Sequence, residues 1–304
     1  MPTANNYYID KALTNVSIRF TNPSYISDIL FPRLAVKNKT GIYYEYDKSN
    51  LRAENDERAP GTEANEINYE LIQRSYGPLI DHALKAKITD EEVEQSDAAL
   101  QPFVDATDAV TEKIWLSKEI DAANKLAAIT QGINLAAGQQ WSDYSNSDPI
   151  SDIQLGVDTV KGASLRVPNI LVMGYQVYVK LIHHPDLLGL LPVTQTRMMN
   201  LQKLAEIFGV DQIVVGDAQK NTAIQGATDA LQYVWGKSAY LLYAEQNPGL
   251  RKMSSTYTLE LTNGVEVGRW YEQPIRSTFV EVRRFYEQKI TNASAVYKFA
   301  TAVA

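Results

Sequence analysis

Histidine and acidic side chains are the groups in this sequence that could bind a metal or transfer protons. The chain has three histidines, His82, His183 and His184, and no cysteine. Neighbouring residues of a helix point about 100° apart, so His183 and His184 cannot place both rings on one helical face. We expect this pair to mark a helix end, where histidine can bond the last carbonyls. Neither the pair nor the isolated His82 predicts a metal or catalytic site.

Acidic residues cluster at 54–57 and at 90–94, where Asp90, Glu91 and Glu92 are consecutive. A calcium loop would need regularly spaced Asp or Asn with a glycine, which these clusters lack, so we interpret them as solvated faces. The sequence also lacks a Walker phosphate loop, a Gly-x-Gly-x-x-Gly fingerprint, a nucleophile elbow and a His-Glu-x-x-His motif. We therefore expect no catalytic residue, no metal site and no cofactor.

The length and composition are those of a globular chain. It has 304 residues, of which 45% are hydrophobic and 21% charged, enough for one large domain or two mid-sized ones. The first residues lack the basic start and apolar stretch of a signal peptide. No apolar run approaches the roughly 18 to 20 residues that a membrane helix needs. These features predict a soluble intracellular protein with no membrane partner.

The net charge of −7 is unevenly distributed. Residues 45–100 contain 14 acidic and 6 basic side chains, a net charge of −8, whereas the rest of the chain has a net charge of +1. The two ends are mildly basic, which permits contact with a polyanion there. Because basic residues form no continuous stripe, the same pattern also fits ordinary solvated surface.

The first 75 residues predict segments that need a partner surface. Residues 1–40 look irregular, because they are mostly polar and Pro23 and Pro32 interrupt any helix. Residues 26–36 are apolar, which suggests an extended arm lying on another surface. Residues 41–73 predict a long hairpin, with strands at each end and a charged connection between them. A two-stranded ribbon is marginal alone, so it either packs against another chain or forms a surface loop.

The strongest helical pattern follows. Residues 102–129 contain no glycine and no internal proline, and Pro102 suits the first helical position. Such a helix would reach about 40 Å and serve as the backbone of a domain. Gly132 is a plausible stop, and we place a domain boundary near residue 138.

Residues 139–250 predict a mixed α/β unit. Asp148 and Pro149 can begin a short helix, with Asp152 in its first turn. The apolar runs at 168–174 and 211–218 predict buried strands. The remaining patterns predict helices at 176–183 and 196–208 and a hairpin at 233–243.

The C-terminal segment predicts β-structure, so the expected class is α+β. Residues 256–262 alternate cleanly, and Asn263-Gly264 is the strongest two-residue hairpin signal in the chain. Further strands are expected at 278–290 and near the C-terminus.

Three short blocks in order carry a family resemblance. The first is Trp141-Ser142-Asp143 with Ser147-Asp148-Pro149-Ile150 and Asp152-Ile153; the second is Pro168-Asn169 with Leu171, Val172, Gly174, Leu181 and His184-Pro185; the third is Val215-Gly216 with Ala218 and Asn221, then Val234-Trp235-Gly236-Lys237 and Leu242-Tyr243. With the order of elements, they resemble the major capsid proteins of tailed bacteriophages, which have the Hong Kong 97 fold. Each block alone is weak, but the three together span about 100 residues.

The resemblance implies a division of the chain. Residues 1–40 would be the N-terminal arm and 41–75 the extended E-loop. Residues 76–138 would form the peripheral domain with its long spine helix, and 139–250 the axial domain. Residues 251–304 would return as strands to the peripheral domain.

The resemblance also implies a function and partners. The chain would be a structural protein of the phage head, assembled in the host bacterial cytoplasm, where hexamers and pentamers form an icosahedral shell around double-stranded DNA. Scaffolding, portal and decoration proteins would be further partners. Non-specific DNA contact predicts that Arg19, Arg33 and Arg283 lie on the inner wall. No long helical segment precedes the arm, so a separate scaffold, a removed leader or scaffold-free assembly all stay open.

Other functions remain open at this point. One is the shell of an encapsulin-type nanocompartment, which has the same fold. Another is a tail or decoration protein that forms rings or trimers. The third is a soluble α/β enzyme with a deep polar pocket at residues 168–243.

Overall fold

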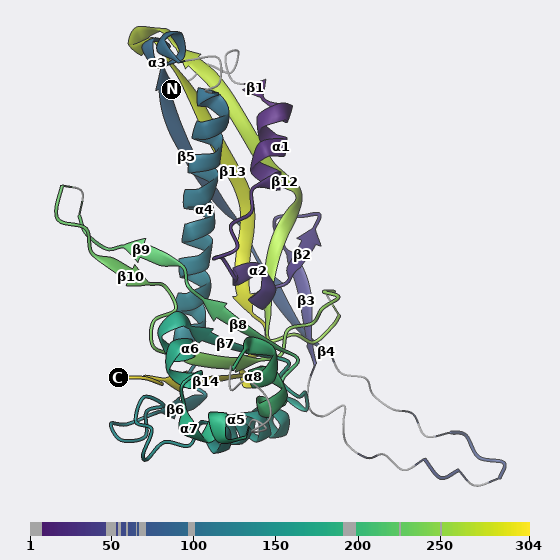
Figure 1. Ribbon diagram of the computed structural model, residues 1–304. Helices are drawn as coiled ribbons and strands as arrows, with labels where there is room; N and C mark the ends of the chain where they lie inside the picture. The colour runs from purple at the N-terminus through teal and green to yellow at the C-terminus, as the bar shows by residue number, and fades with distance from the viewer. Residues whose placement is uncertain are drawn as a thin grey trace.

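The computed structural model describes residues 8–46, 53, 56–58, 60–64, 66, 71–96, 101–190, 199–224, 226–249 and 251–304. They form a long upper lobe and a rounder lower lobe (Figure 1). The helices and strands are, in chain order, β1 (Tyr8–Ile9), α1 (Lys11–Arg19), α2 (Ser27–Leu30), β2 (Arg33–Val36), β3 (Gly41–Tyr46), β4 (Leu71–Tyr76), β5 (Ile80–Thr89), α3 (Asp90–Gln95), α4 (Pro102–Ala127), β6 (Gly132–Asn134), α5 (Pro149–Ser164), β7 (Ile170–Gly174), α6 (Tyr175–Leu181), α7 (Pro185–Gly189), α8 (Leu201–Phe208), β8 (Gln212–Gly216), β9 (Gln219–Asn221), β10 (Leu231–Tyr233), β11 (Ala239–Leu242), β12 (Thr256–Glu272), β13 (Ser277–Ile290) and β14 (Val296–Ala300).

The upper lobe is a long twisted sheet covered on one face by helices. Its strand order is β1–β12–β13–β5, with β2 pairing in parallel to β12. Helices α1 and α4 pack on the face that carries the alternate residues Val280 and Val282 of β13. Strand alternation therefore places Phe279, Glu281 and Arg283 on the other face.

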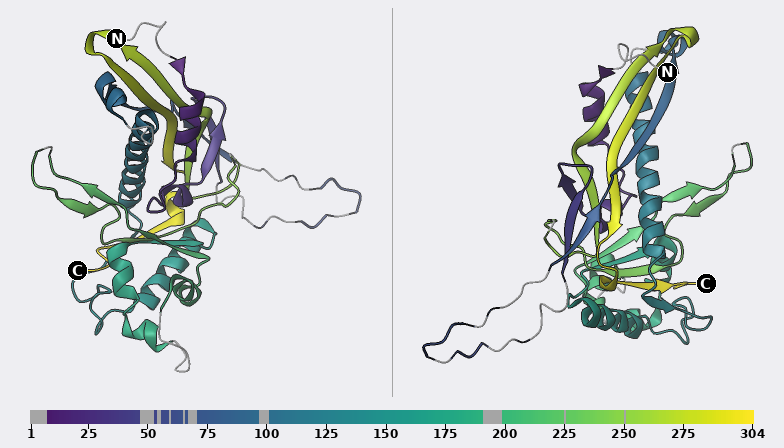
Figure 2. Two further views of the ribbon diagram at one scale, coloured as in Figure 1. Left: turned by 45° about the horizontal axis from the view of Figure 1, so that its top comes forward. Right: turned by 180° about the vertical axis from the view of Figure 1, so that it is seen from behind.

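Helix α4 is the predicted long helix. Pro102 occupies its first position, and the helix ends at Ala127, five residues before Gly132. Its buried face runs along the whole length from Val110 and Ile114 to Leu126. At 1.5 Å per residue its 26 residues span about 39 Å, so the helix connects the upper lobe to the lower one (Figure 2).

The prediction that residues 1–40 are irregular is wrong. Residues 11–19 form helix α1, because the Asp10 carboxylate caps it by accepting hydrogen bonds from the backbone N–H groups of Ala12 and Leu13. Pro23 and Pro32 lie outside the helices, so they do not interrupt them. The apolar segment 26–36 does find a partner surface, since Ile26, Leu30 and Phe31 are buried against the end of α4 within the same chain.

The lower lobe is a mixed sheet of strand order β6–β14–β11–β7–β8. Strand β7 is wholly buried and separates two cores. Its residues Leu171 and Met173 face a core that includes residues of α5, α6, α7 and α8, whereas Ile170 and Val172 face a core with the end of α4. The sheet is thus the shared wall between these helices and the upper lobe.

Several lower-lobe predictions are confirmed. Asp148 caps α5 and Pro149 takes its first position, although the helix has 16 residues and is not short. Buried strands occur at β7 and β8 within the predicted ranges. Helix α8 ends at Gly209, which adopts the left-handed conformation there; residues 196–198 of its predicted start lie outside the described residues.

Two hairpin predictions are wrong. Residues 231–233 pair with β9, and β11 pairs with β7 and β14, so residues 233–243 are not a hairpin. The Asn263-Gly264 pair does not reverse the chain either. Strand β12 runs through it, and its register with β13 shifts between Glu260 and Val265. Asn263 has a φ of 60°, so the signal for a left-handed residue produces a bulge here.

The C-terminal segment divides between the lobes. Strands β12 and β13 join the upper sheet, as expected, but β14 pairs with β11 in the lower sheet, so residues 251–304 do not return as a whole to residues 76–138. Strand β6, at residues 132–134, pairs with β14 as well. After α4 the chain therefore passes between the lobes three times: from α4 to β6, from β11 to β12 and from β13 to β14.

Candidate functional site

The three histidines occupy structural positions. His184 is buried, and its Nε2 lies 3.0 Å from the Ser147 hydroxyl. Burial lowers the pKa of His184 below its usual value, so the ring is neutral near pH 7. His183 is exposed beside it, as its position next to His184 predicts. His82 stacks on Tyr286 with ring centroids 4.0 Å apart.

The described residues contain no group of three or more His, Cys, Asp or Glu side chains that could hold a metal ion. Among these residues, no helix combines the length and apolar character needed to cross a membrane.

An open polar hollow of about 340 Å³ borders the ends of β7 and β11 and overlaps the range 168–243, where the enzyme hypothesis expected a site. Three of its polar side chains, Asn169, Tyr243 and Glu245, are engaged in hydrogen bonds within the chain. The Asn169 amide exchanges hydrogen bonds of 2.8 and 2.9 Å with the backbone of Ala244. Glu245 accepts from the Tyr243 hydroxyl at 3.0 Å and from Lys252 at 3.4 Å. These side chains fix the ends of strands rather than converge on a reacting group.

The most concentrated buried polar chemistry lies where the arm, α4 and the lower lobe meet. The carboxylate of Glu119, which is buried on α4, accepts from the backbone N–H groups of Ile26 and Ser27 at 3.1 and 2.8 Å. It also accepts from the indole Nε1 of Trp235 at 2.7 Å. Burial raises the pKa of Glu119, and the three donors limit that rise. One carboxylate thus joins three parts of the chain.

A cationic cluster surrounds Trp115 next to Glu119. Lys118 is buried and bonds Asp28 at 2.5 Å, and Arg33 also pairs with Asp28. Arg284 is buried and bonds Glu260 at 3.1 Å. The charged ends of Arg33, Lys118 and Arg284 lie 4.9, 4.8 and 4.7 Å from the Trp115 ring. Burial would raise the pKa of Asp28, but its hydrogen bonds to Arg33 and the charge of Lys118 hold it below the usual value.

Two two-stranded ribbons lie on opposite sides of the body (Figures 1 and 2). On one side, β3 and β4 pair in register from Gly41↔Tyr76 to Tyr46↔Leu71, which confirms the base of the predicted hairpin. Most of its connection, including residues 67–70 of the predicted returning strand, lies outside the described residues. On the other side, β9 and β10 pair from Gln219↔Tyr233 to Asn221↔Leu231. Each ribbon forms its own two-stranded sheet.

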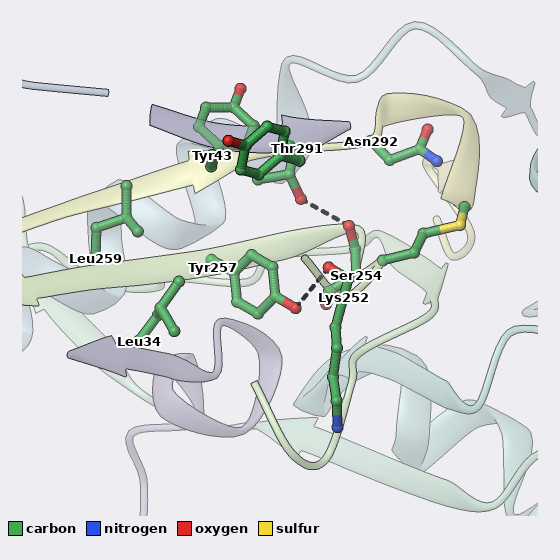
Figure 3. A pocket seen from close by; sticks show the side chains of 10 residues that line it. Leu34, Tyr43, Lys252, Ser254, Tyr257, Leu259, Thr291 and Asn292 are labelled. Atoms are coloured by element: carbon green, nitrogen blue, oxygen red, sulfur yellow. Dashed lines mark hydrogen bonds between the residues drawn. The ribbon is translucent and has the colours of Figure 1, made fainter. Parts of the chain in front are cut away.

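A small pocket lies at the base of the β3–β4 ribbon (Figure 3). Its walls are largely apolar and aromatic: Leu34, Tyr43, Tyr44, Met253, Tyr257 and Leu259. The Tyr257 hydroxyl donates to the backbone carbonyl of Lys252 at 3.0 Å, and burial raises the pKa of Tyr257 to about 12. The cavity volume of about 20 Å³ admits the end of one side chain, far less than the roughly 300 Å³ or more of a metabolite site.

The predicted basic inner wall is not one surface. Arg33 contacts Trp115 on the helix-covered side of the upper sheet. Arg283 lies on the opposite face, because its neighbour Arg284 faces Trp115 and strand residues alternate. Arg283 also pairs with Asp81, and Arg33 with Asp28. A single wall therefore cannot contain both arginines.

Sequence reasoning missed the buried Lys118-Glu119 pair and the β9–β10 ribbon. Lys118 and Glu119 follow the buried Ile114 and Trp115 by four residues each, so helical spacing alone places them on the buried face. That signal could have found them. The ribbon offers a weaker signal, Gly226 between two short polar stretches.

Comparison with known proteins identifies the relatives. The chain is 29% identical over 240 residues to the major capsid protein of Burkholderia phage BcepMu, and the aligned region covers 74% of this chain and 76% of that protein. It is 26% identical over 247 residues to the major capsid protein of Pseudomonas phage JBD67, with 78% of each covered. No family model matches the chain.

Solved structures share the whole architecture. A phage-related protein from Bordetella bronchiseptica RB50 matches with a TM-score of 0.76 at 21% identity, over 97% of each chain. The mature capsid of bacteriophage PhiM1 matches with a TM-score of 0.59 at 12% identity, over 92% of this chain and 88% of that one. An encapsulin of Synechococcus elongatus gives a TM-score of 0.57 at 12% identity, over 93% and 89%.

The fold, with its arm, long α4 and paired lobes, is that of the Hong Kong 97 capsid proteins. Encapsulins share the fold at low identity, whereas the sequence relatives come from phages. The chain is a phage major capsid protein, a structural component of the virion and not an enzyme.

Proposed function

We propose that the chain assembles as hexamers and pentamers into an icosahedral shell that encloses phage double-stranded DNA. The observation that carries the proposal is the pair of ribbons on opposite sides of one elongated subunit. In a ring of identical copies, each contact joins one side of a subunit to the opposite side of the next, which is a head-to-tail interface. A ribbon that is marginal alone gains a partner surface in that arrangement.

We propose the following roles for the parts. The upper lobe with α4 is the peripheral domain, the lower lobe is the axial domain, and residues 41–75 form an E-loop that lies on a neighbouring subunit. The E-loop segment has eight acidic and four basic residues, so its net charge of −4 favours a basic surface on the neighbour. Strand β14, at the end of the chain, belongs with the axial domain.

Scaffolding, portal and decoration proteins are proposed partners on the ground of the family alone. For non-specific contact with DNA, we propose the face of the upper lobe that carries α1, where Lys11 and Arg19 are exposed. Contacts of this kind neutralise phosphates without reading bases and weaken with salt.

Negative-stain electron microscopy of the purified protein, alone and co-expressed with its neighbouring genes, tests the proposal. We expect closed shells tens of nanometres across. A matched variant replaces residues 47–70 by Asn-Gly, which joins the paired ends of β3 and β4 through a two-residue turn. That variant should stop at small oligomers. A uniform small oligomer of the unaltered protein under both conditions would contradict the proposal.

A further inference from the structure

The β9–β10 ribbon carries apolar side chains that its own subunit leaves exposed. Ile224 is 85% exposed and Leu231 is 66% exposed, the two highest values among the large hydrophobic residues described. The ribbon pairs with no other strand of the described chain. Its base is held by stacking of Tyr233 on Tyr175, with ring centroids 5.8 Å apart. A fixed base and an exposed apolar end indicate a contact element rather than a loose loop.

The opposite side of the subunit offers a matching surface. The tyrosine pocket at the base of β3–β4 has apolar walls and room for the end of one side chain. Three cations lie around it: Arg251 at 5.5 Å from the Tyr44 ring, Lys289 at 5.4 Å from the Tyr43 ring, and Lys252 in its lining, which also pairs with Glu245 at 3.4 Å. The surroundings of the pocket stay basic when Glu245 is counted. The ribbon, from Asp217 to Tyr233, carries two aspartates and one lysine, a net charge of −1. Apolar contact and charge are therefore complementary between the two surfaces.

We propose that the β9–β10 ribbon of one subunit packs against the tyrosine pocket of the next subunit in the ring, with Ile224 covering the pocket and Asp229 near its cations. The pocket is lined by Tyr43 and Tyr44 of β3, and the paired β3 and β4 lie on the opposite side of the subunit from β9 and β10 (Figures 1 and 2), so the ribbon and the pocket cannot meet within a single chain. A rotational ring brings them together at every contact. The inference rests on the proposed shell, since it needs neighbouring copies.

The absence of native cysteine makes the contact directly testable. A chain with both Ile224→Cys and Met253→Cys is assembled, oxidised and run on a non-reducing denaturing gel. We expect a ladder of disulfide-linked chains up to hexamers, which collapses on reduction. Each single variant should stay monomeric on the gel. A control pair, Ile224→Cys with Leu84→Cys, places the second thiol on β5, away from the pocket, and should give no ladder.

A second measurement uses the unaltered protein, in case the paired variant does not assemble. Shells formed from a mixture of ¹⁴N- and ¹⁵N-labelled chains are treated with a short amine-reactive crosslinker and digested. We expect Lys220 linked to Lys252 in peptide pairs of mixed label, which only two different chains can produce. Shells that form normally but give neither the ladder nor the mixed-label link overturn this inference and leave the proposed function intact. A link from the ribbon to another surface also overturns it. Failure of the unaltered protein to form shells contradicts the proposed function itself.

Discussion

The indole nitrogen of Trp235 lies 2.7 Å from the Glu119 carboxylate, so a loop of the lower lobe is tied to α4. Trp235 is held from its other side by Gly216, where an added Cβ would lie 2.1 Å from the indole ring. Three elements far apart in the sequence thus meet at one buried ring. The same carboxylate fixes the arm through Ile26 and Ser27.

Removing the Trp235 donor should destabilise the junction. Trp235→Phe leaves a buried carboxylate with one fewer donor and a partly empty space, so we expect a loss of about 2–3 kcal/mol in the free energy of unfolding. Urea unfolding of the purified protein measures this. Trp270→Phe is the matched control, because the Glu272 carboxylate that its Nε1 bonds at 3.1 Å remains accessible to water. An equal loss in both variants would mean that the Glu119 bond adds nothing beyond packing.

Gly216 tests the same contact from the other side. Gly216→Ala forces the Trp235 ring away from its place, and overpacking of this kind costs about 1–3 kcal/mol. Gly162→Ala is the control, because its expected change in the free energy of unfolding has the opposite sign. Gly162 is exposed within α5 and has open space around its Cβ position, so the substitution should stabilise by about 0.5–1 kcal/mol. Thermal melts of the two variants should shift in opposite directions, and a harmless Gly216→Ala would refute the tight fit.

The Asp28 ion pairs predict a pH dependence. The pKa of Asp28 is below its usual value, so the pairs stabilise the fold above about pH 4 and are lost as pH falls through the lowered pKa. Asp28→Asn leaves Lys118 buried without its carboxylate. We expect a loss of about 2 kcal/mol at pH 7, less than for a fully buried pair because the Asp28 side chain is 31% exposed.

The difference between wild type and Asp28→Asn should shrink below about pH 4, which urea unfolding between pH 7 and pH 3 measures. Asp121→Asn breaks the half-exposed pair with Lys125 on the same helix and should cost no more than about 0.5 kcal/mol. A pH-independent difference for Asp28→Asn would show that its charge is not the cause.

The bulge in β12 depends on the left-handed residue Asn263. Asn263→Val places a β-branched residue at a φ of 60°, which costs about 1–2 kcal/mol. Asn263→Gly keeps that conformation and should change stability by only a few tenths of a kcal/mol. The two variants differ at one position only, so the gap in their melting temperatures isolates the backbone conformation. Equal melting temperatures would contradict this account.

Local signals allowed much of the fold to be predicted. Pro102 and the unbroken run after it defined α4, and Asp148-Pro149 defined the start of α5. Predictions were wrong where a local signal is compatible with two structures. Asn263-Gly264 supplies a left-handed residue, which suits a hairpin and a bulge equally, and only pairing with the distant β13 decides between them. Helix α1 was not predicted, because Pro23 and Pro32 argue against a helix in this segment, although both lie outside it and Asp10 provides an N-cap.

The junction and the pocket were harder to predict, because distance along the chain hides their partners. Glu119 accepts hydrogen bonds from Ile26, Ser27 and Trp235, which are separated from it by 93, 92 and 116 positions in the sequence. The pocket combines β2, β3 and residues beyond 250, and no periodic pattern relates such segments. The three sequence blocks that resemble the capsid family predicted the architecture, but they did not predict which side chains form the Glu119 junction and the pocket.

The three crossings between the lobes have a mechanical consequence. A subunit joined at one flexible linker could bend at its waist, but here the bend would have to shear three connecting segments and the buried Glu119 junction together. The subunit should behave as a stiff plate. Any change in the diameter or curvature of the shell would then fall on the contacts between subunits, where we propose that the ribbons lie, and not on the waist of the subunit.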